Sequence, residues 1–447
     1  MRHTLSLIIY FSFFIFFSAF AQVSPKLQVK LDAQAKEIES KVIEWRRHIH
    51  QYPELSTEEF KTAAYVAEHL KNLGLEVQTG VAKTGVVGVL KTGKPGPVIA
   101  LRADMDALPV TERSNLSFAS KEKTIYNGLE TGVMHACGHD SHVAILMGVA
   151  DILVKNKKDL KGMIKFIFQP AEEGGPVGQD RGANLMVKEG VLKNPNVEVI
   201  FGLHISAGTP VGVISYKSGG SAAANDDFYV KVKGKQSHGA MPWSSIDPIV
   251  VSSEIIVALQ TIISRQSDLT NEAAVITVGR FNAGIRENII PEEAIFSGTI
   301  RTLDTVMQKS IHERIIRTAK KIAESAGATA EVSIEPQELV TFNDPTLTTR
   351  MVPSLVKAAG ADNVEIVKAG TGAEDFSFYQ KKVPGLFFSV GAMPADKSKA
   401  GSHHTPDFYI DESGFITGIR AMLDLTVDYM YGRAIAERGA PAAERKK

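Results

Sequence analysis

The segment MHACGHDSH, residues 134–142, gathers side chains that bind metal ions. It holds three histidines, one aspartate and Cys137, the only cysteine among 447 residues. Cys137 and His139 stand two positions apart at the predicted start of a helix, so an irregular turn would let both face one ion. His135 and His142 could instead pack in the core or hydrogen-bond to a metal ligand. A single buried histidine is more often a core residue, but this cluster beside the sole cysteine favours a metal site.

Pairs of acidic residues follow two apolar segments. In RADMDALPV, Asp104 and Asp106 come after VIAL, and in FQPAEEGG, Glu172 and Glu173 come after GMIKFIF. Positions just beyond the carboxyl ends of strands form the ligand crevice of an open α/β sheet. Adjacent side chains diverge, so one glutamate could bind a cation while its neighbour takes a proton from water. The alternative for either segment is a solvated turn or an ordinary charged loop.

Further histidines occur in FGLHI, which contains His204, and in SHHTPDF, which contains His403 and His404. Each histidine alone is weak evidence for a metal site. Together with the other segments, they place cysteine, histidine and carboxylate donors around one predicted sheet. Donors of this number, scattered along the chain, exceed the four of a structural zinc site and indicate a pair of divalent ions. Such a centre activates water and polarises a carbonyl group, which is the chemistry of amide hydrolysis. Cys137 is then expected to be a thiolate ligand and not a nucleophile.

The elements that must position these residues alternate between helices and strands. An amphipathic helix is predicted over 27–50, and Ser56 with Glu59 forms a capping box before a second helix that ends at Gly74. Strands are predicted at 86–90, 98–103, 163–168 and 199–204, and helices at 139–154 and 182–189. This alternation favours an α/β unit with a largely parallel sheet.

The pattern changes after Gly219-Gly220. The order strand, helix, strand, strand, helix, strand is predicted over 227–232, 246–264, 273–278, 294–303, 304–325 and 328–334. It is the split β-α-β-β-α-β arrangement of a ferredoxin-like domain. A mixed α/β pattern returns from Pro345, with a strand at 385–390 and a final helix at 412–431. We therefore expect a catalytic domain in two parts, 22–218 and 337–435, an α+β domain inserted at 219–336, and a flexible tail at 436–447.

The first 21 residues have the layout of a secretory signal peptide. Arg2 precedes an apolar stretch, and Ala19-Phe20-Ala21 matches a cleavage site. An uncleaved anchor helix is the alternative, but the stretch falls short of the ~20 residues that span a bilayer. The sequence thus predicts an exported protein, periplasmic or extracellular, with no stable membrane anchor after cleavage. Loss of Arg2 takes the 50 basic residues to 49, against 50 acidic ones, and this balance points away from nucleic acid and anionic membranes.

A series of longer motifs resembles one enzyme family, the metal-dependent amidohydrolases that include hippurate hydrolase, N-acyl-amino-acid amidohydrolases and auxin-conjugate (IAA-amino acid) hydrolases. The motifs are, in order, RADMDALP, MHACGHDSHVA, FQPAEEG, GANLM, GLH, GKQSHGAMP, RENIIPEEA, GAEDFSFY and HHTPDF. The family is a branch of the aminoacylase and carboxypeptidase G-type metallopeptidase clan. The resemblance covers nearly all of the chain after the leader. It implies an α/β metallopeptidase (phosphorylase/hydrolase-like) catalytic domain with an inserted ferredoxin-like lid and dimerisation domain.

The resemblance also implies roles for individual residues. The expected ligands of two divalent ions, zinc or manganese with cobalt as a further candidate, are Cys137, His139, Glu173, His204 and His404. Glu172 would be the general acid and base, and Asp106 would orient a ligand. In the inserted domain, His238 would contact the scissile carbonyl and Asn288 the substrate carboxylate, with Arg286 as a helper. Asp104 stands where other branches have a metal-binding histidine, so it is not in the expected ligand set.

The expected function is hydrolysis of N-acyl amino acids to a carboxylic acid and an amino acid, by an exported homodimer or higher homo-oligomer. One alternative is a dipeptidase or carboxypeptidase of the same clan. A second is a secreted metal-binding protein without catalysis, although a storage site would not need a glutamate beside Glu173. A third is a deacetylase of cell-wall or diaminopimelate precursors, which the predicted leader disfavours as a cytosolic role. The acyl group and the amino acid preference stay open.

Overall fold

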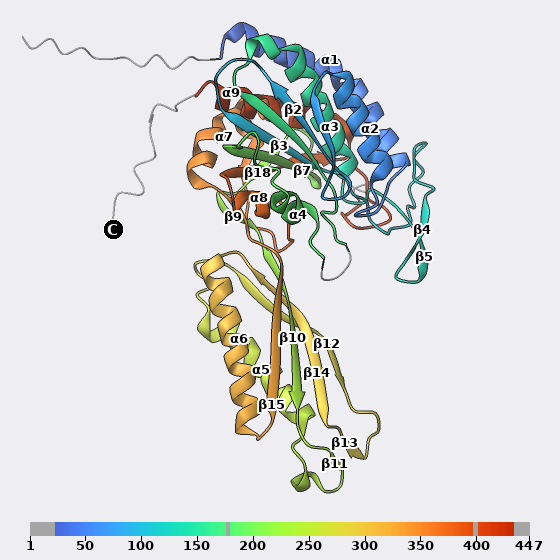
Figure 1. Cartoon of the computed structure of the whole chain (residues 1–447), viewed down its shortest axis with the longest axis vertical. Helices are drawn as coiled ribbons and strands as arrows, with labels where there is room; N and C mark the ends of the chain where they lie inside the picture. The colour runs from blue at the N-terminus through green and yellow to red at the C-terminus, as the bar shows by residue number, and fades with distance from the viewer. Residues whose placement is uncertain (1–22, 176–178, 397–400, 433–447) are drawn as a thin grey trace, which may run out of the picture.

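The computed structural model of the chain describes residues 23–175, 179–396 and 401–432. The signal peptide expected at 1–21 and the flexible tail expected at 436–447 lie outside these ranges. The described chain forms two units, a large one around an eight-stranded sheet and a narrow one around a four-stranded sheet that projects from it (Figure 1).

The large sheet has parallel strands at its centre. Its strands lie in the order β1 (Glu76–Val81), β2 (Gly85–Lys91), β6 (Met163–Gln169), β3 (Val98–Asp104), β7 (Val199–Pro210), β18 (Gly385–Met393), β8 (Ile214–Tyr216) and β17 (Val364–Ile366). The pairs β6/β3, β3/β7, β7/β18 and β8/β17 are parallel, and the other three pairs are antiparallel. The central strands are almost fully buried, as the continuous apolar runs of their sequences require.

Helices cover both faces of this sheet. On one face lie α1 (Pro25–Gln51), α2 (Phe60–Asn72), α3 (His139–Lys155), α7 (Pro345–Ala359) and α9 (Phe415–Met430), which share the main hydrophobic core. On the other lie the short helices α4 (Gly182–Lys188) and α8 (Ser377–Gln380), which form a second core with β2, β6 and β7. Helix α3 is buried along nearly its whole length, because it packs against α1, α9 and the sheet. The start of α3 carries His139 and therefore has a rigid support.

The capping box predicted for Ser56 and Glu59 does not form. Glu59 itself is the N-cap of α2 and makes no side-chain capping bond. The Ser56 hydroxyl instead donates to Asp106 at 2.6 Å, and Glu59 accepts from the backbone N–H of Ala171 and the hydroxyl of Thr84. Tertiary partners have outcompeted the local bond, since buried carboxylates need donors. Ser56 and Glu59, which match a helix-capping pattern in the sequence, instead hydrogen-bond to the segments that follow β3 and β6.

The narrow unit has the split order predicted from its sequence. Its elements are β10 (Ala224–Lys233), α5 (Pro248–Gln266), β12 (Ala274–Ala283), β14 (Glu293–Thr302), α6 (Thr305–Ser325) and β15 (Thr329–Glu338), with sheet order β12-β14-β10-β15. Both helices bury one face against the sheet. The unit spans 224–338, where 219–336 was expected, because β9 (Gly219–Ala222) pairs with β16 (Thr341–Asn343) beside the large unit. We call 224–338 the inserted unit.

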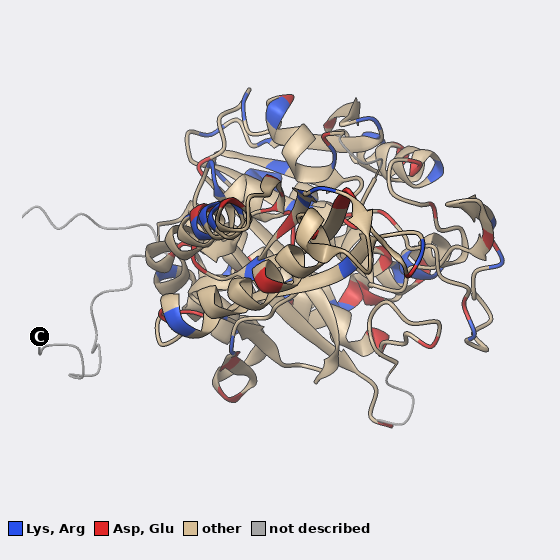
Figure 2. Cartoon of the chain, turned by 90° about the horizontal axis from the view of Figure 1, so that it is seen from below, with Lys and Arg blue, Asp and Glu red and all other residues tan. Residues whose placement is uncertain are grey.

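Two short two-stranded sheets lie at the tip of the inserted unit and at one side of the large unit. At the tip of the inserted unit, β11 (Ser237–His238) pairs with β13 (Ile289–Ile290), and on the large unit β4 (Lys123–Tyr126) pairs with β5 (Leu129–Gly132) (Figure 1). By length and composition alone, helix α5 could cross a membrane. Its buried residues, however, pack on the four-stranded sheet. Basic and acidic residues are interspersed over the helices and loops seen in Figure 2.

Candidate metal centre

Three neighbouring strands bring the acidic residues and one histidine to the same edge of the large sheet. Asp104 ends β3 and Asp106 follows it, and Glu172 and Glu173 follow β6. His204 lies at the middle of β7, two residues beyond Gly202, the last residue of β7 that pairs with β3. These strands are adjacent and parallel, in the order β6-β3-β7. Their carboxyl ends therefore meet in one crevice, as open α/β sheets predict.

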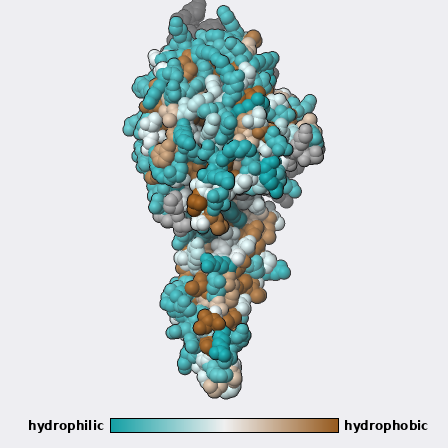
Figure 3. Space-filling view, turned by 90° about the vertical axis from the view of Figure 1, so that its right-hand side faces the viewer, coloured by the Kyte–Doolittle hydropathy of each residue, from teal (hydrophilic) through white to brown (hydrophobic). Residues whose placement is uncertain are grey.

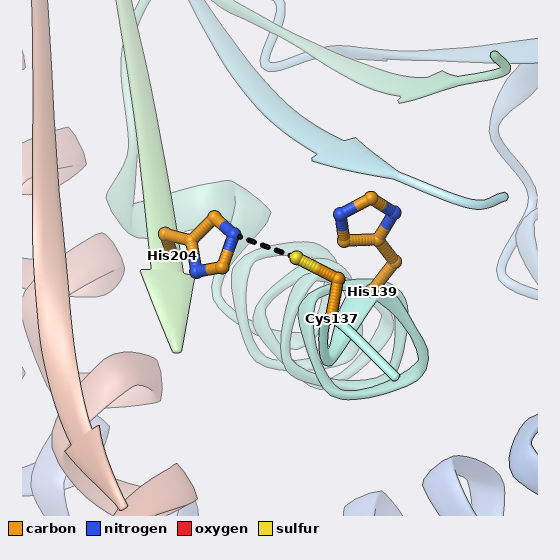
Figure 4. A group of neighbouring side chains, drawn as sticks. All are labelled: Cys137, His139 and His204. Carbon is orange, nitrogen blue, oxygen red and sulfur yellow. Dashed lines mark hydrogen bonds between the residues drawn. The ribbon is translucent and has the colours of Figure 1, made fainter. Parts of the chain in front are cut away.

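A tight turn before α3 presents Cys137 and His139 to the same crevice. Gly138, the N-cap of α3, has φ 98°. A Cβ atom there would lie 2.3 Å from Cγ2 of Ile205, so the position requires glycine for space as well as for backbone conformation. Figure 4 shows Cys137 between the rings of His139 and His204, and its Sγ lies 3.4 Å from Nε2 of His204.

Backbone carbonyls fix the tautomer of two of these imidazoles. Nδ1 of His139 lies 2.9 Å from the carbonyl oxygen of Asp106, and Nδ1 of His204 lies 2.7 Å from that of Ile205. A carbonyl only accepts, so each Nδ1 carries a proton, and Nε2 is the nitrogen that the neutral ring offers to a metal ion. This is the arrangement of metal-binding histidines, whose second nitrogen donates to a carbonyl or carboxylate. Nε2 of His139 is buried without a hydrogen-bond partner among the described residues.

The five expected ligands converge with Glu172. Among the groups whose donor atoms all lie within 4.8 Å of one another, those formed by these six residues are Cys137, His139 and His204; Cys137, Glu173 and His404; and His139, Glu172 and Glu173. Oε1 of Glu173 lies 3.1 Å from Nε2 of His404. Burial, followed by the charge of Glu173, raises the pKa of the Cys137 thiol, so a nearby cation is what would hold it as a thiolate. The donor set and the orphaned nitrogen of His139 therefore fit a divalent metal site.

The structure also separates His404 from His403. Nε2 of His403 accepts from the backbone N–H of Ala207 at 3.2 Å, and its Nδ1 lies 3.1 Å from the carbonyl oxygen of Cys137. Both ring nitrogens of His403 are thus engaged with backbone, whereas His404 points its Nε2 at Glu173. The geometry supports His404 as the ligand of this pair.

Glu172 and Asp106 differ in their surroundings. Burial, together with the charges of Glu374 and Glu173, raises the pKa of Glu172 well above its usual value, and Oε2 lies 3.9 Å from Nε2 of His139. Burial disfavours a charged Asp106, but the hydrogen bond and charge of His139, with the hydrogen bonds from Ser56 and the Glu173 backbone, together outweigh it and lower the pKa of Asp106. A carboxyl whose pKa is raised suits proton transfer, and one that stays ionised suits the orientation of a ligand.

The sequence alone did not single out a buried ionic cluster beneath the centre. Arg102, which is 1 % exposed, contacts Asp104 at 2.6 Å and both Glu374 and Asp375 at 2.9 Å. The GAEDFSFY motif, which contains Glu374 and Asp375, thus serves the site through charge pairing. Both oxygens of Asp104 are engaged, one by Arg102 and the other by Nδ1 of His142 at 2.5 Å.

A cavity of about 590 Å³ opens onto the donors between the large unit and the base of the inserted unit. Glu172, Glu173 and His404 line one side of it, and Tyr216, Val367 and Phe387 provide apolar wall. The strands of the inserted unit contribute Asn225 and Arg301. This is the size of an ordinary small-molecule site with an apolar wall and a few polar groups.

His238, Asn288 and Arg286 are not brought to this cavity. His238 lies in β11 and pairs with Ile289 in β13, and the N–H of Gly239 donates to the carbonyl of Asn288. All three side chains are exposed at the far tip of the inserted unit (Figure 1). His238 and Asn288 are therefore close to each other but distant from the donors of the same chain.

Known proteins resemble this chain over most of its length. Residues 100–428 match peptidase family M20/M25/M40. Thermostable carboxypeptidase 2 of Saccharolobus solfataricus is 41 % identical over 402 residues, which cover 90 % of this chain and 98 % of that protein. N-acetyl-L-cysteine deacetylase of Bacillus subtilis is 38 % identical, covering 85 % and 86 %. IAA-amino acid hydrolase ILR1-like 4 of Arabidopsis thaliana is 37 % identical, covering 82 % and 80 %.

Solved structures share the fold as well. A putative aminohydrolase from methicillin-resistant Staphylococcus aureus is 35 % identical with a TM-score of 0.83, and the match covers 90 % of this chain and all of that one. The YXEP protein of Bacillus subtilis, described as a dinuclear metal binding peptidase, is 35 % identical with a TM-score of 0.73, covering 88 % and 99 %.

Proposed function

Because this chain belongs to peptidase family M20/M25/M40 and is a hydrolase of amide bonds, we propose that it cleaves N-acyl amino acids to a carboxylic acid and a free amino acid. The family resemblance and the α/β fold predicted from the motifs are confirmed by the matches. The observation that carries the proposal is the position of Glu172, which stands in the cavity beside five converging metal donors.

Two divalent ions, zinc, manganese or cobalt, would be held by Cys137, His139, Glu173, His204 and His404, and when bound they would supply water of lowered pKa and a polarised substrate carbonyl. Glu172 takes a proton from the attacking water while the oxygen of that water bonds to the carbonyl carbon. The same carboxyl then gives the proton to the nitrogen as the C–N bond breaks. Asp106 keeps His139 in the tautomer and orientation that the site needs.

We further propose that His238 and Asn288 complete the site of a second copy of the chain. Asn225 lines the cavity, and β10 runs from there to Lys233 near the tip, which at strand geometry is roughly 26 Å. A hinge motion of the inserted unit preserves its internal distances, so it cannot carry His238 to the donors beside its own base. In a two-fold dimer, His238 of the partner subunit would meet the scissile carbonyl instead.

The surface of the inserted unit supports such an association. Strand β12 is an unpaired edge of the four-stranded sheet, with Val275 and Phe281 exposed on it. The neighbouring helix α5 exposes Val250 and Val257, the latter at 68 %. Figure 3 shows hydrophobic patches on the inserted unit, whereas the large unit is mainly hydrophilic on this face. Apolar edges of this kind are typical of protein–protein contact.

Mixing two inactive variants tests the shared site. His238→Ala and Glu172→Gln are each expected to lose activity, but a mixed dimer keeps one site with Glu172 in one chain and His238 from the other. Random pairing of equal amounts would restore about a quarter of the parent activity. Co-expression with two affinity tags provides the mixed dimer. If the purified mixed dimer stays inactive while each variant still binds metal, the shared site is contradicted.

We propose export from the cytoplasm to the periplasm or the exterior, on the leader-like composition of the first 21 residues. The near balance of basic and acidic residues supports a small-molecule substrate and no nucleic-acid partner. Secretion is read directly from the N-terminal sequence of the protein recovered from a cell fraction, where Gln22 is expected first. An intact Met1 in the cytoplasmic fraction would refute export.

A carboxypeptidase is the second candidate, because the relatives named above include one. A substrate screen separates the two. Metal-stripped protein reloaded with zinc, manganese or cobalt is assayed on acetyl, benzoyl, indolylacyl and fatty-acyl amino acids and on peptides with a free carboxyl terminus. The proposal expects higher kcat/KM on N-acyl amino acids. Preference for peptides would favour the carboxypeptidase, and no turnover with any metal would leave the proposal without support.

A further inference from the structure

His142 lies one turn into α3, between the ends of two strands of the large sheet. It is 1 % exposed. Its Nε2 lies 2.8 Å from the backbone nitrogen of Ile205 in β7, and its Nδ1 lies 2.5 Å from Oδ1 of Asp104 at the end of β3. A backbone N–H only donates, so Nε2 is the acceptor and Nδ1–H donates to the carboxylate. The ring is thus a neutral bridge with both nitrogens engaged.

The bridge replaces a missing strand partner. Strand β3 pairs with β7 as far as Arg102 opposite Gly202, and β7 continues beyond that point along β18 only. The N–H of Ile205 is fully buried and would lack a partner without His142. Ile205 directly follows His204, and its carbonyl oxygen accepts from Nδ1 of His204. One residue therefore carries both the contact with His142 and the contact that orients His204.

The other end of the bridge is anchored in the buried ionic cluster. Oδ2 of Asp104 lies 2.6 Å from the guanidinium of Arg102, which also contacts Glu374 and Asp375. Asp375 is held in turn by Gln169 and the backbone N–H of Ala183. The position of Ile205 is thus set by a continuous chain of buried hydrogen bonds that ends in the loop with Glu374.

We infer that His142 is a positioning residue for His204, which it acts on through the backbone of Ile205, and that it sets how tightly the centre binds metal. Cys137 and His139 move with α3, whereas His204 moves with β7, so the distance between them depends on a link between these elements. His142 supplies that link from α3 itself. This inference rests on the proposed role of His204 as a metal ligand.

His135 provides a matched control within the same motif. It is also a buried histidine, at 1 % exposure, but neither ring nitrogen has a hydrogen-bond partner among the described residues. His142→Leu and His135→Leu remove the same group from neighbouring positions, and only the first removes the bridge. His142→Gln keeps an acceptor for Ile205 and a donor for Asp104 on one terminal amide.

The test measures cobalt affinity by competition with a chromophoric chelator, and the thiolate-to-cobalt absorption of Cys137. His142→Leu is expected to lose about 10- to 100-fold in affinity, as loss of an outer partner does, with a changed absorption band. His142→Gln should recover most of the affinity, and His135→Leu should stay near the parent. Circular dichroism checks the fold, and His142→Met replaces the leucine variant if that variant does not fold.

Two results would overturn this inference and leave the proposed metal centre intact. One is parent-like cobalt affinity in His142→Leu, and the other is an equal loss in His135→Leu and His142→Gln, which would mean that any change in this core weakens the site. A parent protein that takes up no cobalt would contradict the proposed metal centre and the inference with it.

Discussion

Glu172→Gln is expected to lose roughly 10² to 10⁴ in kcat, the usual contribution of a general acid and base, which is about 3 to 5 kcal/mol of activation free energy. Glutamine keeps the size of the side chain but neither takes nor gives the proton. The variant should retain the metal content of the parent, because Glu172 is not among the expected ligands. Steady-state kinetics and elemental analysis of the same preparation measure both quantities.

The adjacent residue is the control. Glu173→Gln changes the neighbouring carboxylate in the same way, but Glu173 lies 3.1 Å from His404 in the donor cluster, so this variant should lose metal. The pH profile gives a second check. Because a base must be ionised, the raised pKa of Glu172 places the acidic limb of kcat/KM above the usual range for glutamate, and activity falls as pH drops through it. Full activity in Glu172→Gln would refute its role.

Cys137→Ser is expected to lose metal affinity by more than the roughly 10- to 100-fold that loss of an outer partner costs. Serine offers no thiolate, and Cys137 belongs to two donor groups, one with His139 and His204 and the other with Glu173 and His404. Activity should fall in parallel at limiting metal. Equilibrium dialysis against buffered zinc measures the affinity of parent and variant.

Thiol titration of the parent provides an independent check on Cys137. It is the only cysteine of the chain, so a thiol reagent reports on this residue alone. Cys137 lines the cavity, so it should react in metal-free protein at a pH high enough to ionise its thiol of raised pKa, and added metal should protect it. Equal reaction rates with and without metal, or unchanged metal affinity in Cys137→Ser, would contradict its assignment as a ligand.

Much of the site could be predicted because its residues follow strands whose order is simple. Apolar runs identified β3, β6 and β7, and parallel strands place their carboxyl ends together, so Asp106, Glu173 and His204 had to converge. His403 and His404 are equivalent by residue type, and the family resemblance selected His404. The backbone partners of His403 agree with that choice.

Other features depended on partners that are distant in the sequence. Arg102 reads as an ordinary strand residue, and its pairing with Glu374 joins segments 272 positions apart. Ser56 matched a local capping pattern, but Asp106 offered a buried acceptor that the pattern does not contain. The fold of the inserted unit was predicted, and the length of β10 places His238 at its tip. How far His238 lies from the metal donors became known only from the position of the inserted unit on the large unit.

The most direct test of a two-metal amidohydrolase is the recovery of activity against metal equivalents. Metal-free protein is titrated with zinc or manganese, and hydrolysis of the best N-acyl amino acid is followed at each step. We expect no activity in the metal-free protein and maximal activity at two equivalents per chain. Glu172→Gln should bind the same two equivalents without hydrolysing the substrate. Undiminished hydrolysis by metal-free protein in the presence of a chelator would contradict the account.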